Sequence, residues 1–387
     1  MRGLARRRRG RSSVRAIGLA AFLAWSCAAC GLGLAYDPEV PPPGARDASD
    51  STSEVVTASS DPNGSSDDAP RRGGWFWRGN DFGTDAYAGP FDVLLNRGMA
   101  VAQWEDLSRD LGEIDFQWEA VRRSIFESSV PVEAAGGWRE VLRQHAFPFD
   151  EENFRRANWV PNYAGHVIEG GISYRRLAEW NEAQGVPFPY LTAAVTSYGA
   201  AVVNEAYEMP NGPGFPTQDG TPGATVDLLI FDPLGMLLFS FDAPSRFFAN
   251  TLRANVWPTQ AAITLDDAWV VNNGQAAIFK LPLPWTDVRL FMRAGMGFEA
   301  GLTLPRPDGL NVNLAAGFQS RNRFVDPFDQ TESINQSFSA GVWVDRDNVL
   351  VASFTFDAET DRRFAVNLFP GSFELGVLGR PGVFAFL

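Results

Sequence analysis

The sequence predicts an α+β fold: a helical core domain followed by an antiparallel β-meander that is barrel-like and of the outer-membrane type. Three observations support this prediction. Apolar residues recur at helical spacing between about residues 90 and 240. Beyond about residue 260 they alternate with polar or small residues at every second position, which is typical of strands. A basic, Ala-rich start indicates export from the cytoplasm.

Composition divides the chain into four parts. The apolar content of 45% and charged content of 20% are those of a folded protein, but one stretch near the start is rich in Pro, Ser, Asp and Gly and cannot bury enough apolar surface to fold. We therefore expect a signal peptide at residues 1–35, a disordered acidic linker at 36–73, a helical domain with a His/Glu/Asp core at 74–256 and an antiparallel β-barrel-like domain at 257–387.

The first 35 residues resemble a signal peptide. Seven arginines fall within the first fifteen residues, and the apolar run at 17–29 that follows is too short for a comfortable transmembrane helix. Cys27 and Cys30 are candidates for lipidation because each lies in a sequence resembling a lipoprotein box, whereas ordinary cleavage after Ala35 is the rival prediction. Both cysteines lie in this segment, so we expect neither a disulfide nor a thiolate metal site in the folded part.

Charge argues against one class of partner. Removal of the seven N-terminal arginines would take the net charge from -13 to -20. A chain this acidic is a poor candidate for binding nucleic acid or an anionic surface. We therefore predict no nucleic-acid partner.

Proline and glycine mark the ends of the predicted helices. Within the last long helix, Pro233 is expected to introduce a bend and Gly235 to let a neighbouring backbone approach. His145, beside the break at 147–149, is expected at the surface or as a cap. The predicted helices are one beginning just after Pro90, two short ones at 113–126 and 137–145, and three longer ones at 161–184, 187–209 and 225–239.

About eight strands are expected to form the meander. The residues at 345–348 form the turn of a hairpin. A soluble or peripheral barrel with its apolar face packed on the helices is the alternative to one in or at the outer membrane. The clearest alternating segments are 288–298, 310–319, 338–344, 350–356, 363–368, 373–379 and 383–387.

One polar cluster is predicted on the long helices. His166, Glu205 and Asp227 each lie among small or apolar residues on a different helix, and buried ionisable groups are expected to pair. Two interpretations stay open: a catalytic site with His166 as base, or a satisfied buried network that fixes the helix register. Because no nucleophile motif is present, we favour the network, with Asn162, Glu169, Tyr174 and Glu208 as further members. The ligand spacing predicts no metal site, and no cofactor motif is found.

The same stretch resembles an uncharacterised bacterial exported family, domain of unknown function 3943. Asn162 and His166 precede Gly170 and Tyr174 at steps of four, and Asn204-Glu205, Asp227-Leu228 and Pro233-x-Gly235 follow them. The resemblance covers about residues 160–240. Val167 follows the histidine where the family pattern has Pro, and Asn204 replaces an aromatic residue. The resemblance implies a helical His/Glu/Asp core joined to an envelope β region, and it implies no activity.

Together these features predict a cell-envelope protein that is a structural or lipid-associated component of the Gram-negative outer membrane and not an enzyme. Its expected partner is the outer membrane or its lipids, and its expected location is on the periplasmic side of that membrane or within it. The helices are expected to plug or cap the barrel. The alternative is a membrane-proximal hydrolase or transferase that acts on an envelope lipid or glycan through His166, Glu205 and Asp227.

Overall fold

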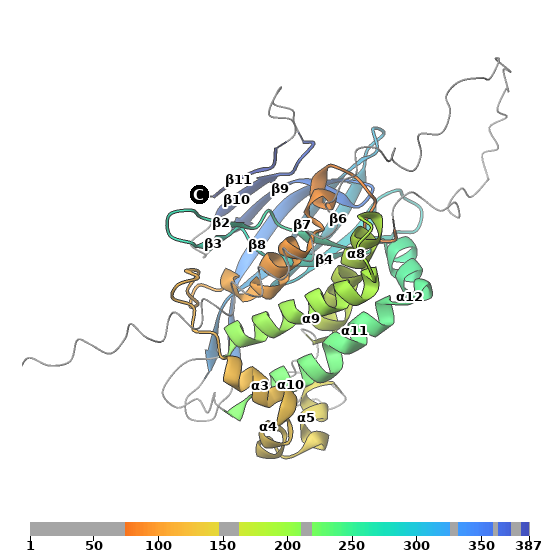
Figure 1. Cartoon of the computed structure of the whole chain (residues 1–387). Helices are drawn as coiled ribbons and strands as arrows, with labels where there is room; N and C mark the ends of the chain where they lie inside the picture. Colours follow the sequence, from red (N-terminus) through yellow and green to blue (C-terminus); the bar gives the residue numbers. More distant parts are fainter. Residues whose placement is uncertain are drawn as a thin grey trace, which may run out of the picture.

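The computed structural model of the chain describes residues 74–146, 162–209, 219–325, 332–358, 363–372 and 381–386. These residues form a layer of helices beside one large curved antiparallel sheet, so the α+β class is confirmed (Figure 1). The predicted signal peptide with Cys27 and Cys30, the predicted linker and the strand expected at 373–379 lie outside the described residues.

Short helices and helical turns come first along the chain, and the long helices follow them. Helices η2 and η4 are 3₁₀-helical, and η3, η5, η7 and η8 are π-helical. The bounds are η2 Gly83–Tyr87, α2 Pro90–Val93, η3 Leu94–Gly98, η4 Ala100–Gln103, α3 Trp118–Phe126, α4 Ser129–Ala134, α5 Trp138–His145, η5 Asn162–Glu169, α8 Gly170–Ala183, α9 Pro189–Glu208, α10 Pro222–Val226, η7 Asp227–Phe231, α11 Asp232–Phe239, α12 Asp242–Arg246 and η8 Phe247–Thr251.

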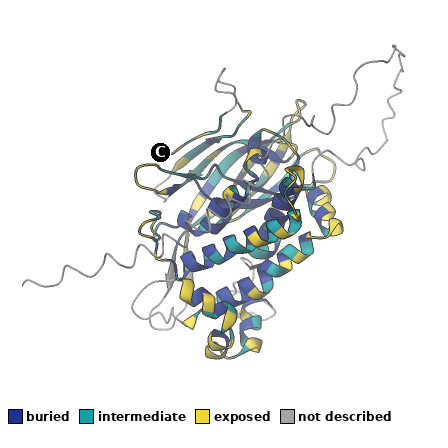
Figure 2. Cartoon of the chain, viewed as in Figure 1, coloured by how far each residue is buried: buried dark blue, intermediate teal, exposed yellow. Residues whose placement is uncertain are grey.

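Helix α9 is the central helix of the helical layer. Pro189 opens its first turn, and small side chains line its buried side, which appears as a dark stripe in Figure 2. Ala200 lies against Gly98 of η3, where an added Cβ would come within 3.4 Å of the Ala200 Cα. Small residues thus let α9 pack closely on η3 and α8, and they place Glu205 inside the layer.

The run from α10 through η7 to α11 is one helical stretch, Pro222–Phe239. Among the described residues it alone is long and apolar enough, by length and composition, to cross a membrane, and half of it is buried within the protein. Pro233 follows the π turn of η7 and lies in the first turn of α11. Since a proline ring lacks the backbone N–H and needs room in the preceding turn, the π turn accommodates it inside the stretch.

Gly235 holds this stretch against η5. A Cβ at Gly235 would lie 2.8 Å from the carbonyl oxygen of His166 and 2.7 Å from that of Val167. Only a residue without a side chain allows two backbones to come this close. The close approach expected at Gly235 is confirmed, and it sets the position of His166.

Nine strands of the described residues form the large sheet in the order β1-β4-β5-β6-β7-β8-β9-β10-β11, a meander interrupted by the small β2–β3 hairpin. The helices contact the sheet chiefly at β1 and β4, through α8 and η5, and at β9 through η2. The bounds are β1 Asn255–Pro258, β2 Ala262–Ile263, β3 Val270–Val271, β4 Gln275–Pro282, β5 Arg289–Ala294, β6 Gly297–Pro305, β7 Leu310–Val325, β8 Glu332–Arg346, β9 Val349–Asp357, β10 Phe364–Leu368 and β11 Val383–Phe386.

The sheet curls but is open, so the expectation of closure into a barrel is wrong for the described residues. β1 and β11 form its two edges and do not pair with each other. Instead, the Gln260 amide just beyond β1 donates to the Val383 carbonyl of β11 at 3.1 Å and to Asn367 of β10 at 3.4 Å. Alternation specifies which face a residue occupies, but closure depends on strand number and tilt, which alternation does not encode.

The expected position of the helices also needs correction. The helix η2, rather than the long helices, occupies the inside of the curve: its Tyr87 ring packs edge-on against Phe369 at 6.0 Å. The Leu350 amide of β9 donates to the Thr84 hydroxyl at 3.2 Å. The long helices pack at the β1–β4 edge because Val256 and Phe279 join their apolar cluster there.

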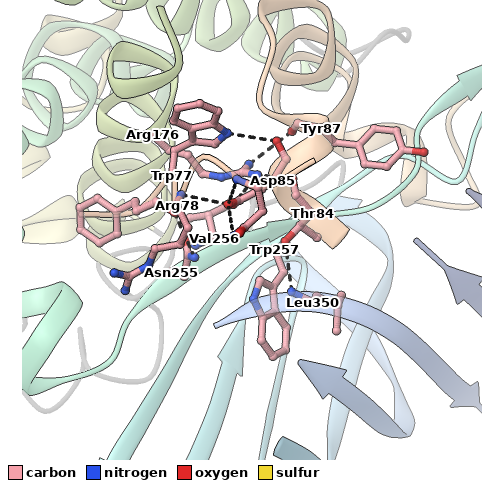
Figure 3. A network of polar contacts seen from close by, with 12 residues as sticks. Trp77, Arg78, Thr84, Asp85, Tyr87, Arg176, Asn255, Val256, Trp257 and Leu350 are labelled. Atoms are coloured by element: carbon pink, nitrogen blue, oxygen red, sulfur yellow. Dashed lines mark hydrogen bonds and ion pairs between the residues drawn. The ribbon is translucent and has the colours of Figure 1, made fainter. Parts of the chain in front are cut away.

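A network of polar contacts fixes η2 between α8 and the sheet (Figure 3). Arg176 of α8 donates to the carbonyl oxygens of Thr84 and Tyr87 and lies 3.9 Å from the Asp85 carboxylate. That carboxylate also accepts from the Arg78 amide at 2.9 Å. Thr84, Asp85 and Arg176 are buried, and these bonds replace part of the water that they lose on folding.

The segment before η2 is held by a single carboxylate. The backbone amides of Trp75, Phe76 and Trp77 all donate to Glu179 of α8, at 2.8 to 2.9 Å. Arg175 pairs with the same carboxylate at 2.9 Å. The carboxylate is therefore satisfied although Glu179 is buried.

Candidate functional site

The structure brings together the three residues predicted as a cluster. His166 is supplied by η5, Glu205 by α9 and Asp227 by η7. One nitrogen or carboxylate oxygen from each lies within 4.8 Å of the others. Glu205 and Asp227 are buried, whereas the His166 side chain keeps 22% of its surface exposed.

A second carboxylate, Asp232, completes the surroundings of the imidazole. His166 Nδ1 lies 3.2 Å from Asp232 Oδ1, and His166 Nε2 lies 3.7 Å from Asp227 Oδ2. Asp232 is fully buried and also pairs with the Arg97 guanidinium. The histidine ring is thus held between two aspartates on one helical stretch.

Sequence reasoning missed Asp232 because it assumed α-helical geometry. At about 100° per residue, positions five apart lie about 140° apart around an α-helix, so Asp227 and Asp232 would face different sides. The π turn of η7 has hydrogen bonds from residue i to i+5, and it brings both carboxylates to the same histidine. The sequence did carry one sign of this π turn: an apolar run that is followed by Pro233.

Arg97 was also missed, since 135 residues separate it from Asp232. Its guanidinium donates to the Gly170 carbonyl oxygen at 3.3 Å, and a Cβ at Gly170 would lie only 2.6 Å from Arg97 Nη2. Gly170 therefore makes room for the arginine beside α8. No local pattern near residue 97 indicates this contact.

The electrostatics of the cluster divide its carboxylates into two kinds. Burial raises the pKa of Asp227 to about 7, and burial together with Glu208 and Asp227 raises that of Glu205 well above its usual range. For Asp232, burial opposes ionisation, but His166 and Arg97 outweigh it and lower the pKa. Burial likewise opposes the charging of His166, and Asp227 and Asp232 overcome it and raise that pKa. Asp232 is thus the fixed anion, and the other two carboxyls hold protons readily.

The further members expected in the network are mostly bonded elsewhere. Asn162 donates to the His145 carbonyl oxygen at 3.1 Å, and the Tyr174 hydroxyl pairs with Ser240 at 2.9 Å. Glu169 accepts from Gln275 at 3.0 Å, and Glu208 accepts from Asn204 at 3.5 Å. These hydrogen bonds lead to groups other than His166, so the membership of the four residues in the network stays a prediction.

His145 is separate from this cluster and is buried, with 6% of its surface exposed. The expectation of a surface position is therefore wrong, whereas His145 does lie in the last turn of α5. Gly223 of α10 lies beside its ring, and within the described part of the chain its Nδ1 has no hydrogen-bond partner. Burial lowers its pKa to about 4, so the ring is neutral at pH 7.

The arrangement is suited to proton transfer or cation binding rather than to nucleophilic attack. Within the described part of the chain, no hydroxyl is hydrogen-bonded to His166, whose ring contacts are the two aspartates. A serine-type nucleophile needs that bond to its base. The imidazole and the carboxylates are, by contrast, ordinary metal ligands.

Comparisons of the chain with protein-family models, with curated proteins and with solved structures find no match. The resemblance of residues 160–240 to domain of unknown function 3943 therefore stays a prediction.

Proposed function

We propose that the protein is a structural, lipid-associated component of the Gram-negative outer membrane, with one face of its sheet against lipid acyl chains. The observation that carries the proposal is that apolar side chains lie on the exposed face of the sheet and charged ones on its buried face, the reverse of the arrangement in a soluble protein. We call the exposed, apolar side the outer face. We call the buried side the inner face, which carries charged and polar side chains beside a cluster of aromatic ones.

The outer face presents large apolar side chains from β6 to β10. Register places Phe298, Phe318 and Phe338 side by side on three adjacent strands. An open hollow of about 520 Å³ on this face is lined by Ala, Gly, Val, Leu and Phe residues. Soluble monomers rarely expose apolar patches of this kind. The residues of the outer face that are more than a third exposed are Phe298, Leu302, Leu304, Leu314, Phe318, Phe338, Phe354 and Phe364.

The inner face carries the charges. Lys280 pairs with Asp345 at 2.5 Å, and Arg293 pairs with Glu299 at 2.8 Å. A soluble sheet buries its apolar face and exposes its polar one. Strands with apolar residues outward and polar residues inward are instead typical of sheets that face lipid.

Strand length and the predicted export signal agree with this proposal. β7 has 16 residues and β8 has 15, whereas about 9 to 11 tilted residues cross a bilayer core. A cleaved leader would deliver the chain to the envelope. The helical layer, packed at the β1–β4 edge, would then lie beside the lipid-facing strands.

A flotation assay with zwitterionic vesicles tests the proposal. Leu302 of the outer face is 43% exposed and Leu191 of α9 is 62% exposed, so Leu302→Arg and Leu191→Arg make the same change on the two layers. In a chain carrying Cys27→Ser and Cys30→Ser, which removes any acyl anchor, we expect the parent to float with the vesicles. Leu302→Arg should weaken partitioning by about 2–4 kcal/mol, the cost of arginine at the bilayer midplane, and Leu191→Arg should not.

Two results would contradict the proposal. The parent chain could stay with the soluble fraction, or both arginine variants could lose partitioning equally. Far-UV circular dichroism of each variant verifies that the fold is kept.

A second candidate, a hydrolase or transferase acting on an envelope lipid or glycan, rests on one observation. His166 is oriented by Asp232, faces Asp227 and stays partly exposed. The variant His166→Gln separates the two functions. The structural role predicts a loss of roughly 1–3 kcal/mol in the free energy of unfolding, whereas an enzyme predicts an unchanged free energy with a lost envelope phenotype.

A further inference from the structure

We propose that His166, Glu205 and Asp227 form a binding site for one divalent cation of the zinc class, within the helical layer. The site is independent of the lipid-facing sheet. Its three ligand atoms come from three separate helical elements and lie within 4.8 Å of one another.

The spacing is close to that of a metal site. Two atoms that share a tetrahedral ion with bonds of about 2.1 Å lie roughly 3.4 Å apart. His166 Nε2 and Asp227 Oδ2 are already 3.7 Å apart. A small inward shift of the Glu205 carboxylate would complete three ligands.

The unsatisfied state of Asp227 is a second and independent observation. The residue is only 8% exposed, and its Oδ1 has no hydrogen-bond partner among the residues that the structure describes. Its other oxygen faces His166 without a bond of normal length. A buried carboxylate oxygen without a donor is costly, and a cation between His166, Glu205 and Asp227 would satisfy it.

The surroundings of the histidine match those of a metal ligand. Asp232 holds His166 at Nδ1, which directs Nε2 toward Asp227, and Arg97 in turn holds Asp232. Metal-bound histidines nearly always donate their other ring N–H to such a carboxylate, which fixes the ring and its tautomer. Asp232 is here a positioning residue and not a ligand.

The ligand set selects the ion. Imidazole favours zinc, iron, nickel or copper, and two carboxylates supply the charge that a dication needs. Calcium is disfavoured because it takes six to eight oxygen ligands. Three protein ligands leave the fourth position of a tetrahedral ion open for water, as in zinc sites with three protein ligands and one exchangeable position.

Cobalt(II) is the probe for the test, because it replaces zinc and absorbs visible light. The full chain, without an affinity tag and freed of metal with a chelator, is titrated with Co²⁺ alone. We expect one equivalent to bind with a visible band that Zn²⁺ abolishes. Because the chain has only two histidines, one shifted imidazole N–H signal in the proton NMR spectrum should persist in His145→Gln and disappear in His166→Gln.

Variants of equal size identify the ligands. Asp227→Asn and Glu205→Gln should lose the cobalt band, and Asp232→Asn should weaken binding about ten- to a hundredfold. His145→Gln, at a buried histidine separate from the cluster, should bind like the parent. The proposal is overturned if the parent shows no band at one equivalent. It is also overturned if folded Asp227→Asn or Glu205→Gln binds as the parent does.

Discussion

Replacing Lys280 with methionine is expected to destabilise the sheet, because it removes the cation beside a buried carboxylate. Lys280 is 1% exposed, Asp345 is 0% exposed, and their charged groups are 2.5 Å apart. Methionine keeps most of the side-chain volume, so little cavity forms. The loss therefore reports the charge and not the packing.

The size of the loss follows from what remains around Asp345. Breaking a buried ion pair from one side costs about 3–5 kcal/mol. Asn311 and Asn313 still donate to the carboxylate at 3.0 and 2.7 Å, which favours the lower end of that range. Lys280 also lies 5.1 Å from the Trp257 ring, a contact whose loss adds about 1 kcal/mol. We expect a total near 4 kcal/mol.

Chemical denaturation followed by tryptophan fluorescence measures this loss. The double variant Lys280→Met/Asp345→Asn should recover part of it, because the unpaired charge is gone. Arg122→Met, which breaks an exposed pair with Glu119, is the control and should cost less than about 1 kcal/mol. A loss under about 1 kcal/mol for Lys280→Met, or a double variant no more stable than the single one, would refute the reasoning.

Two further predictions concern the helical layer. Gly235→Ala should lower the free energy of unfolding by about 1–3 kcal/mol, because the new Cβ would meet two carbonyl oxygens of η5. Gly165→Ala on η5 is the control and should leave the free energy of unfolding unchanged, since nothing lies within 4 Å of its new Cβ. Equal melting temperatures for the two variants would contradict this account. Burial lowers the pKa of His145 from 6.5 to about 4, so between these pH values the unfolded chain binds a proton that the folded chain does not. The free energy of unfolding should therefore decrease by about 3 kcal/mol as the pH falls from 6.5 to 4. The free energy of unfolding of His145→Gln should fall less steeply over that range, and an unchanged slope would show that His145 does not titrate as described.

Local chemistry made much of the fold predictable. Helix α9 begins at Pro189, within two residues of the predicted start at 187, and Gly235 lies at a close approach of backbones as expected. These features depend on the residue itself and its near neighbours. Alternation likewise placed the segments 310–319, 338–344 and 350–356, which lie in β7, β8 and β9, since a strand exposes alternate residues to opposite faces. The segment expected at 288–298 is instead divided between β5 and β6, because alternation does not mark the tight turn between them.

What could not be predicted depends on contacts between distant residues or on a departure from regular geometry. Arg97 reaches Asp232 across 135 residues, and nothing near Arg97 indicates it. The π turn of η7 changed which residues face His166, so a fixed period of 3.6 excluded Asp232. The edges β1 and β11 do not pair, and the side chain of Gln260 contacts Asn367 and Val383 there, an arrangement that a strand pattern does not report.

The hydrogen bonds to Glu179 determine how the protein would respond to a pull on its N-terminus. Tension entering the fold at Gly74 first meets three consecutive backbone amides that all donate to one buried carboxylate. If the linker before Gly74 tethers the protein to a surface, the hydrogen bonds from Trp75, Phe76 and Trp77 to Glu179 bear the tension before it reaches the helices and the sheet.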